Sequence, residues 1–97
     1  MAKTYTVTSK VWRYPGMAGW FFAYVDRKQS GVLKEKYAKK AAGFGSIRVS
    51  VTLGKSKWKT SIFPDKQSGT YLLPLKASVR RTEGIDEGDE IVFTVKI

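Results

Sequence analysis

Residues 48–59 contain four cationic side chains whose spacing could place them together to bind an anionic ligand. Lys57 and Lys59 lie two residues apart in an alternating segment, so in a β-strand both would point to the same face. Arg48 belongs to the preceding alternating segment, and Lys55 lies in the turn between the two. Cations that neutralise phosphates release counterions, so this hairpin face predicts salt-sensitive, largely sequence-independent binding of nucleic acid or another polyanion.

Three further cations lie in a later segment that we expect to be helical. Lys76 and Arg80 are four residues apart and would share one face of that helix. A helix lying beside the hairpin would extend the basic surface. The candidate nucleic-acid-binding residues are therefore Arg48, Lys55, Lys57, Lys59, Lys76, Arg80 and Arg81.

The competing candidate is a pocket for a small ligand or a protein segment, without catalytic activity. Its residues combine aromatic rings, one hydroxyl and two cations: Trp20, Trp58, Thr60, Lys76 and Arg80. A cavity in which polar groups converge between apolar walls is typical of ligand sites. A second set of aromatic residues could stack on the bases of a single strand, although packing would explain them equally well. These residues are Trp12, Tyr14, Trp20, Phe22 and Tyr24.

The amino-acid composition argues against an enzyme. The chain has no cysteine and no histidine, which excludes thiolate nucleophiles, disulfides, His-based triads and zinc sites built from these residues. The carboxylates Glu87, Asp89 and Glu90 are adjacent around a glycine, which favours a tight turn over a metal site. We therefore expect a binding protein with no catalytic residues, no cofactor and no metal.

The net charge of +10 is unevenly distributed along the chain. Residues 1–82 carry 17 Lys or Arg against 3 Asp or Glu, whereas residues 83–97 carry 5 acidic residues against one lysine. A basic domain with an acidic end favours a polyanionic partner, nucleic acid first. The competing interpretation is that the lysines serve solubility alone.

The length of 97 residues predicts a single domain spanning residues 1–97. No segment approaches the roughly 18 apolar residues of a membrane span, so we expect no membrane partner. The first residues pass directly into an alternating pattern without the apolar core of a signal peptide, which predicts a cytoplasmic protein. The sequence is compatible with a monomer or a homodimer.

Two strands and a helix are predicted before residue 46. Residues 4–12 alternate as a half-buried strand, and residues 20–25 are apolar on both faces. We expect the barrel and a helix to cover the second strand, although an open aromatic face is the alternative. Asp26 is a candidate helix cap, and residues 43–45 would end the helix. The residues on its buried face would be Gln29, Leu33, Tyr37 and Ala41.

Residues 47–53 and 56–62 predict a hairpin with a two-residue turn at Gly54-Lys55. This turn places Leu53 opposite Ser56 and fixes which side chains share a face. The inner face would hold Ile47, Val49, Val51, Trp58, Thr60 and Ile62. The outer face would hold Arg48, Ser50, Thr52, Lys57, Lys59 and Ser61.

The C-terminal part predicts a second strand–helix–strand unit. Phe63-Pro64 would close the hairpin, residues 70–73 form a short strand, and Pro74 would start a helix reaching Thr82 with Leu75 and Val79 inward. Gly84 would stop this helix, a Gly88-Asp89 turn would follow, and residues 91–97 alternate as a last strand. The order of elements echoes residues 20–53. We therefore expect a mainly β fold, a pseudo-symmetric barrel of about six strands with two short helices.

Most of the chain resembles a small prokaryotic family known as domain of unknown function 1905 (DUF1905). The matching motifs are Gly19-Trp20-Phe21, Gly43-Phe44-Gly45-Ser46, Trp58-Lys59-Thr60-Ser61-Ile62-Phe63-Pro64, Tyr71-Leu72-Leu73-Pro74-Leu75-Lys76 with Arg80, and Gly88-Asp89. That family resembles the double-split β-barrels of AbrB- and MazE-type regulators and antitoxins, mostly dimeric DNA binders. The resemblance implies a bacterial protein with a double-split barrel that one chain can close, and DNA binding only by analogy.

Overall fold

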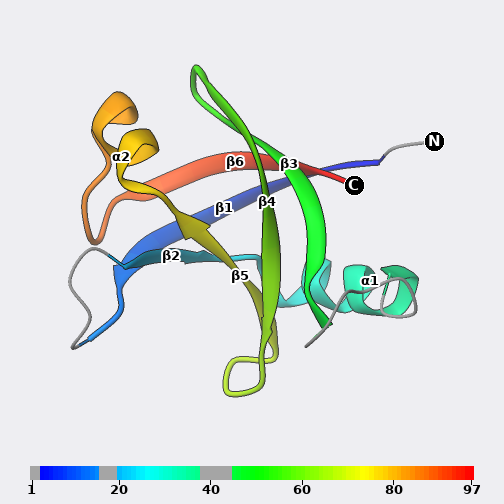
Figure 1. Cartoon of the computed structure of the whole chain (residues 1–97). Coiled ribbons are helices and arrows are strands. Elements are labelled where there is room, and N and C mark those ends of the chain that lie inside the picture. The colour runs from blue at the N-terminus through cyan, green and yellow to red at the C-terminus, as the bar shows by residue number, and fades with distance from the viewer. Residues whose placement is uncertain (1–2, 16–19, 38–44) are drawn as a thin grey trace.

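A computed structural model describes residues 3–15, 20–37 and 45–97 of the chain. Within them, six strands form a closed antiparallel barrel in the order β1-β2-β5-β4-β3-β6, and two helices lie outside it (Figure 1). This confirms the predicted mainly β barrel. Neither helix is long and apolar enough to cross a membrane. The elements are β1 (Thr4–Arg13), β2 (Phe21–Tyr24), α1 (Arg27–Tyr37), β3 (Ile47–Leu53), β4 (Ser56–Asp65), β5 (Thr70–Leu75), α2 (Ala77–Glu83) and β6 (Glu90–Lys96).

Two long strands change partner after their seventh residue. Strand β1 pairs with β6 over residues 4–10 and with β2 over residues 11–13. Strand β4 likewise pairs with β3 over residues 56–62 and with β5 over residues 63–65. At each change of partner the neighbouring strands diverge and leave a split in the barrel wall. The unit β1-β2-α1-β3 is thus repeated as β4-β5-α2-β6. The sequence predicts the last three elements of each unit, strand, helix and strand.

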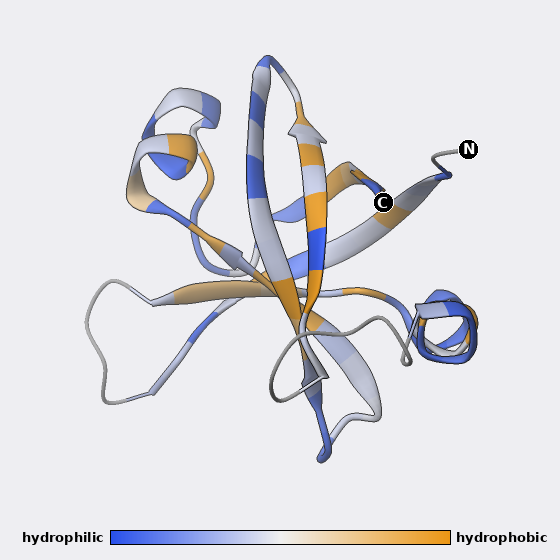
Figure 2. Ribbon diagram, turned by 45° about the vertical axis from the view of Figure 1, so that its right-hand side comes forward, coloured by the Kyte–Doolittle hydropathy of each residue, from blue (hydrophilic) through white to orange (hydrophobic). Residues whose placement is uncertain are grey.

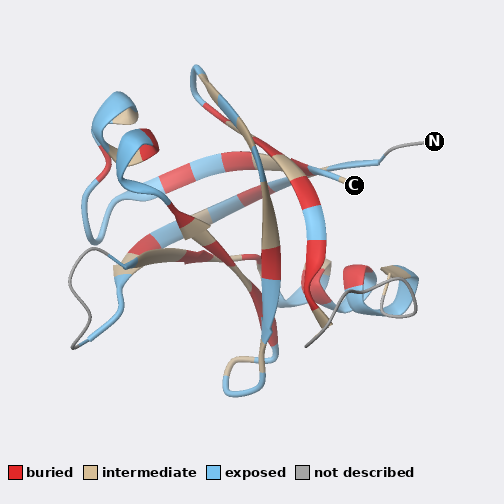
Figure 3. Cartoon of the chain, viewed as in Figure 1, coloured by how far each residue is buried: buried red, intermediate tan, exposed pale blue. Residues whose placement is uncertain are grey.

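The barrel interior is filled by alternate residues of every strand. Val7, Phe93 and Val95 are among the fully buried side chains, and their strand neighbours face outward. Figure 3 shows this as alternating buried and exposed bands along β1, β3 and β6, and Figure 2 shows alternating hydropathy along the hairpin strands. Burial of these branched and aromatic side chains is the main stabilising term of the fold.

The β3–β4 hairpin has the predicted register. Leu53 lies opposite Ser56 and Ile47 opposite Ile62, with Gly54 at a φ of +59° in the turn. The local two-residue turn fixes this pairing, which explains why sequence alone predicts it. The predicted inner residues Ile47, Val49, Val51 and Ile62 are buried. Trp58 and Thr60, also predicted inward, are only partly buried because they face a split.

Helix α1 begins where predicted but contributes differently to the core. The Gln29 backbone N–H donates to Asp26 Oδ1 (2.8 Å), which is the expected cap. Leu33 is fully buried, as predicted. Gln29 does not pack inward; its Nε2 donates to the Thr6 carbonyl (2.7 Å), an acceptor that β1 leaves free at the first split. Ala41, the last predicted face residue, lies outside the described residues.

Both prolines of the C-terminal half lie in strands, which corrects two predictions. Pro64 does not close the hairpin but continues β4 opposite Tyr71, and Pro74 belongs to β5 opposite Phe22. Each has a strand partner on one side only, where a residue without an N–H is tolerated. Helix α2 therefore starts at Ala77, with Lys76 in an extended conformation before it. Gly84 ends the helix in the left-handed conformation (φ 65°), as predicted.

The Gly88-Asp89 segment is a structural turn, as predicted. Asp89 Oδ2 accepts from the Asp86 backbone N–H (2.8 Å), and Gly88 has a φ of +87°. The turn is tied to β1, because the Gly88 N–H donates to the Val11 carbonyl and the Val11 N–H to the Asp89 carbonyl, both at 2.8 Å. The Asp89 carboxylate thus holds the backbone of this loop.

A carboxylate of α2 clamps the tip of the hairpin. Glu83 Oε2 accepts from the Ser56 hydroxyl (2.7 Å) and from the Lys55 backbone N–H (3.3 Å). The carboxylate lies directly against Gly54, in the space that a Cβ at that position would occupy. Gly54 is therefore needed both for its positive φ and for the approach of Glu83.

We expect Gly54→Ala to lower the free energy of unfolding by more than Gly69→Ala does. Gly69 has a similar φ (+71°) but open space where a Cβ would lie, so its substitution costs only the backbone term of about 1–2 kcal/mol. Gly54→Ala additionally displaces Glu83 and should cost about 1 kcal/mol more. Urea denaturation of both variants measures the difference. In a Glu83→Ala background the two costs should become equal; an unchanged difference would contradict the clamp.

Candidate functional site

The predicted hairpin cations gather on one outer surface together with a lysine from β6. Lys59 lies opposite Ser50, and Ser50 lies opposite Lys96 on the other side of β3, so the three form one row across three strands. Arg48 is two residues from Ser50 on the same side of β3. We call Arg48, Lys57, Lys59 and Lys96 the basic face; all four are exposed.

Sequence reasoning missed Lys96 because it lies in the acidic C-terminal segment. The antiparallel β3–β6 pairing is non-local and brings Lys96 beside the hairpin, while Glu90 at the other end of β6 pairs with Lys10. Glu90 and Lys96 are six positions apart along the strand, a distance of about 20 Å. The alternation of β6, with Thr94 and Lys96 on its outward side, is the one sequence signal that could have indicated this.

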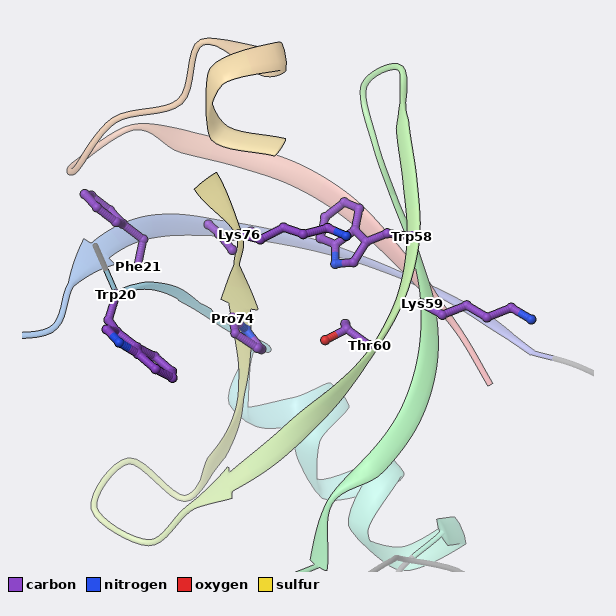
Figure 4. A pocket seen from close by; sticks show the side chains of 8 residues that line it. Trp20, Phe21, Trp58, Lys59, Thr60, Pro74 and Lys76 are labelled. Atoms are coloured by element: carbon purple, nitrogen blue, oxygen red, sulfur yellow. The ribbon is translucent and has the colours of Figure 1, made fainter. Parts of the chain in front are cut away.

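The remaining predicted cations lie elsewhere. Lys55 is at the hairpin tip, where its backbone is held by Glu83. Lys76 lines a cavity at the second split and Arg80 stacks on Phe21 beside it, whereas the Lys59 side chain points away from that cavity (Figure 4). Arg81 is exposed on α2. The structure therefore brings Arg48, Lys57 and Lys59 together and does not place the α2 cations on the same surface.

A cavity of about 290 Å³ opens at the second split, where β4 leaves β5. Figure 4 shows Thr60 pointing into it and Lys76 extending across it toward Trp58, whereas Lys59 points away. Four of the five residues predicted for a pocket line this cavity: Trp20, Trp58, Thr60 and Lys76. We call it the split cavity; its other lining residues are Phe21, Lys59, Pro74 and Leu75.

Arg80, the fifth predicted pocket residue, lies behind the wall of the split cavity. Its guanidinium carbon is 3.8 Å above the centre of the Phe21 ring, and Phe21 lines the cavity. Its Nε is buried and has no hydrogen-bond partner among the residues that the structure describes. A planar cation stacked on an aromatic face is held by electrostatic attraction and by packing. Arg80 is therefore a positioning residue for Phe21 rather than a free surface cation.

Within the described residues, aromatic rings and not a helix cover the outward side chains of β2, contrary to the prediction. Phe22 and Tyr24 pack on Trp12, with ring centres 5.2 Å apart in each case. Trp20 stacks on Phe22 at 5.9 Å and is half exposed. We call Trp20, Phe22, Trp12 and Tyr24 the aromatic row. Burial, with the carboxylate of Asp65 adding to it, raises the pKa of Tyr24.

Comparison with known proteins gives a family but no activity. A family model described as a domain of unknown function, DUF1905, matches residues 8–95. The chain belongs to the DUF1905 family. No curated protein matches the chain significantly. The described part of this DUF1905 domain contains no group of three or more His, Cys, Asp or Glu side chains that could hold a metal ion.

For this DUF1905 domain we expect Arg80→Ala to lower the free energy of unfolding by about 1–2 kcal/mol, because Phe21 loses its stacked cation. Arg80→Lys should recover only part of the loss, since an ammonium does not stack as a plane. The matched control is Arg81→Ala, one residue away and exposed, which should change stability by no more than about 0.5 kcal/mol. Thermal and urea denaturation measure all three; equal effects at positions 80 and 81 would contradict the positioning role.

Proposed function

We propose that this DUF1905 domain binds nucleic acid through the basic face. The observation that carries the proposal is the row formed by Lys59, Ser50 and Lys96, with Arg48 and Lys57 beside it. In the part of the chain that the structure describes, these cations have no carboxylate partner. Four unpaired cations on one surface raise the local concentration of a polyanion and neutralise its phosphates.

Hydroxyl groups between the cations support the same function. Ser50, Thr52 and Ser61 lie on the outward side of the hairpin, and Thr94 lies opposite Thr52 on β6. Serine and threonine hydroxyls donate to phosphate oxygens and help to fix the position of a backbone. The sequence between Ile47 and Ile62 contains no carboxylate that would repel a phosphate. Such a surface binds the backbone and does not read base sequence.

The fold adds support by analogy alone. The predicted similarity to AbrB- and MazE-type double-split barrels, which mostly bind DNA, agrees with a nucleic-acid partner. In those regulators two short chains build one barrel, whereas one chain of this DUF1905 domain closes its own. A shared fold does not transfer function, so the charged surface and not the fold carries the argument.

Titrations of labelled DNA and RNA over a range of salt concentrations test the proposal. We expect the logarithm of the affinity to fall linearly with the logarithm of the salt concentration. Each phosphate that is neutralised should add about 0.7–0.9 to the magnitude of the slope. The variant Lys57→Ala/Lys59→Ala should reduce the slope by about 1–2 and weaken binding at low salt. The effect should be the same for unrelated base sequences.

The control variant Lys28→Ala/Lys34→Ala removes two lysines from α1, outside the basic face, and matches the change in net charge. It should leave most of the affinity intact. Absence of binding at low salt would overturn the proposal. Equal losses in both double variants would show that net charge, and not the basic face, is responsible.

A further inference from the structure

The basic face and the split cavity lie on the two sides of one strand. Alternation along β4 points Lys57 and Lys59 outward and turns Trp58 and Thr60 toward the cavity. Figure 4 shows Lys59 directed away from the cavity and Thr60 directed into it. Residues 56–62 of β4 pair with β3 and, within the described chain, have no partner on the side of β5. An anionic polymer bound to Lys57 and Lys59 on the outer surface can therefore reach the cavity across this free edge of β4.

The chemistry of the split cavity fits a flat ring carried on an anionic backbone. Trp20, Phe21 and Trp58 provide aromatic surface, and Pro74 and Leu75 provide aliphatic surface. The polar groups are the Thr60 hydroxyl and the Lys76 ammonium, and in the described chain neither is engaged by another side chain. The volume of about 290 Å³ is at the lower end of the range for small-ligand sites, which suits one ring system.

The aromatic row continues from the mouth of the cavity. Trp20 lines the cavity and also stacks on Phe22, which packs on Trp12. Trp12 in turn stacks on Tyr24 with an angle of 20° between the rings. These rings lie on the outer surface of neighbouring strands, because Trp12 is opposite Phe22 in the β1–β2 pair. Aromatic side chains on the outside of a sheet are a common platform for stacked bases.

We propose that this surface binds single-stranded nucleic acid and that the split cavity takes one unpaired base. The base lies between Trp20 and Trp58, where the Thr60 hydroxyl can donate to or accept from its edge. Its phosphates lie by Lys76 and Lys59, and neighbouring bases stack along the aromatic row. The inference rests on the proposed nucleic-acid binding and deepens it by naming the strand state. A duplex does not fit, because its bases are stacked and paired internally.

Affinities for three probes of equal length test the inference: a single-stranded oligonucleotide, the corresponding duplex, and a single strand with abasic sites and the same phosphates. We expect the single strand to bind at least about 10-fold more tightly than the other two at equal salt. Trp20→Ala should weaken single-strand binding by about 5- to 100-fold and leave duplex and abasic binding unchanged. Trp20→Phe should restore most of the affinity.

Trp20 is half exposed, so its substitution should leave the fold intact, which urea denaturation verifies. Val32→Ala, an exposed apolar residue on α1, is the matched control and should have no effect on any probe. Equal affinity for all three probes, or an unchanged affinity of Trp20→Ala, would overturn the single-strand inference and leave the proposed function standing. Failure of every probe to bind at low salt would overturn both. If a free mononucleotide bound as tightly as the oligonucleotide, the single-strand inference would also be overturned. The aromatic row and the basic face would then contribute nothing to the affinity.

Discussion

The whole architecture depends on the change of partner within β1 and β4. A strand of ten residues that pairs with one neighbour for most of its length and with another for the rest cannot keep both neighbours adjacent. The barrel closes, but each long strand leaves backbone groups without a ladder at its split. Helix α1 satisfies one of these groups through Gln29, and α2 reaches the other long strand through Glu83. Each helix is thus tied to one of the two long strands.

The same constraint separates the outer surface into two regions of different chemistry. One sheet contains β6, β3 and the first part of β4, and its outward residues are lysines, an arginine and hydroxyls. The other contains β2, β5 and the ends of the long strands, and its outward residues are largely aromatic or aliphatic. The second split lies where these regions meet. A ligand that needs both a cationic and an aromatic surface finds them side by side there.

How much can be predicted from the sequence depends on how local each interaction is. The hairpin register is predicted residue by residue, because a two-residue turn at Gly54 determines it. The cap at Asp26 and the stop at Gly84 are equally local and are confirmed. The prediction for Pro74 is wrong because a proline fits the first turn of a helix and an edge-like strand position equally well, and only the pairing of β5 with β2 decides. The position of Lys96 beside the hairpin and the packing of Phe22 on Trp12 also depend on pairings between distant segments.

The two splits are related by the repeat but are occupied differently, and this has a consequence for sequence drift. At the first, a side-chain hydrogen bond from Gln29 joins helix and strand, so a change there breaks an interaction and lowers stability. At the second, the wall is already hollow, so a new side chain on its rim creates no additional void. The first split is held fixed by the cost of unfolding, whereas the rim of the second is free to diversify. A duplicated motif of this kind can therefore evolve new binding preferences in its second copy while its first copy preserves the barrel.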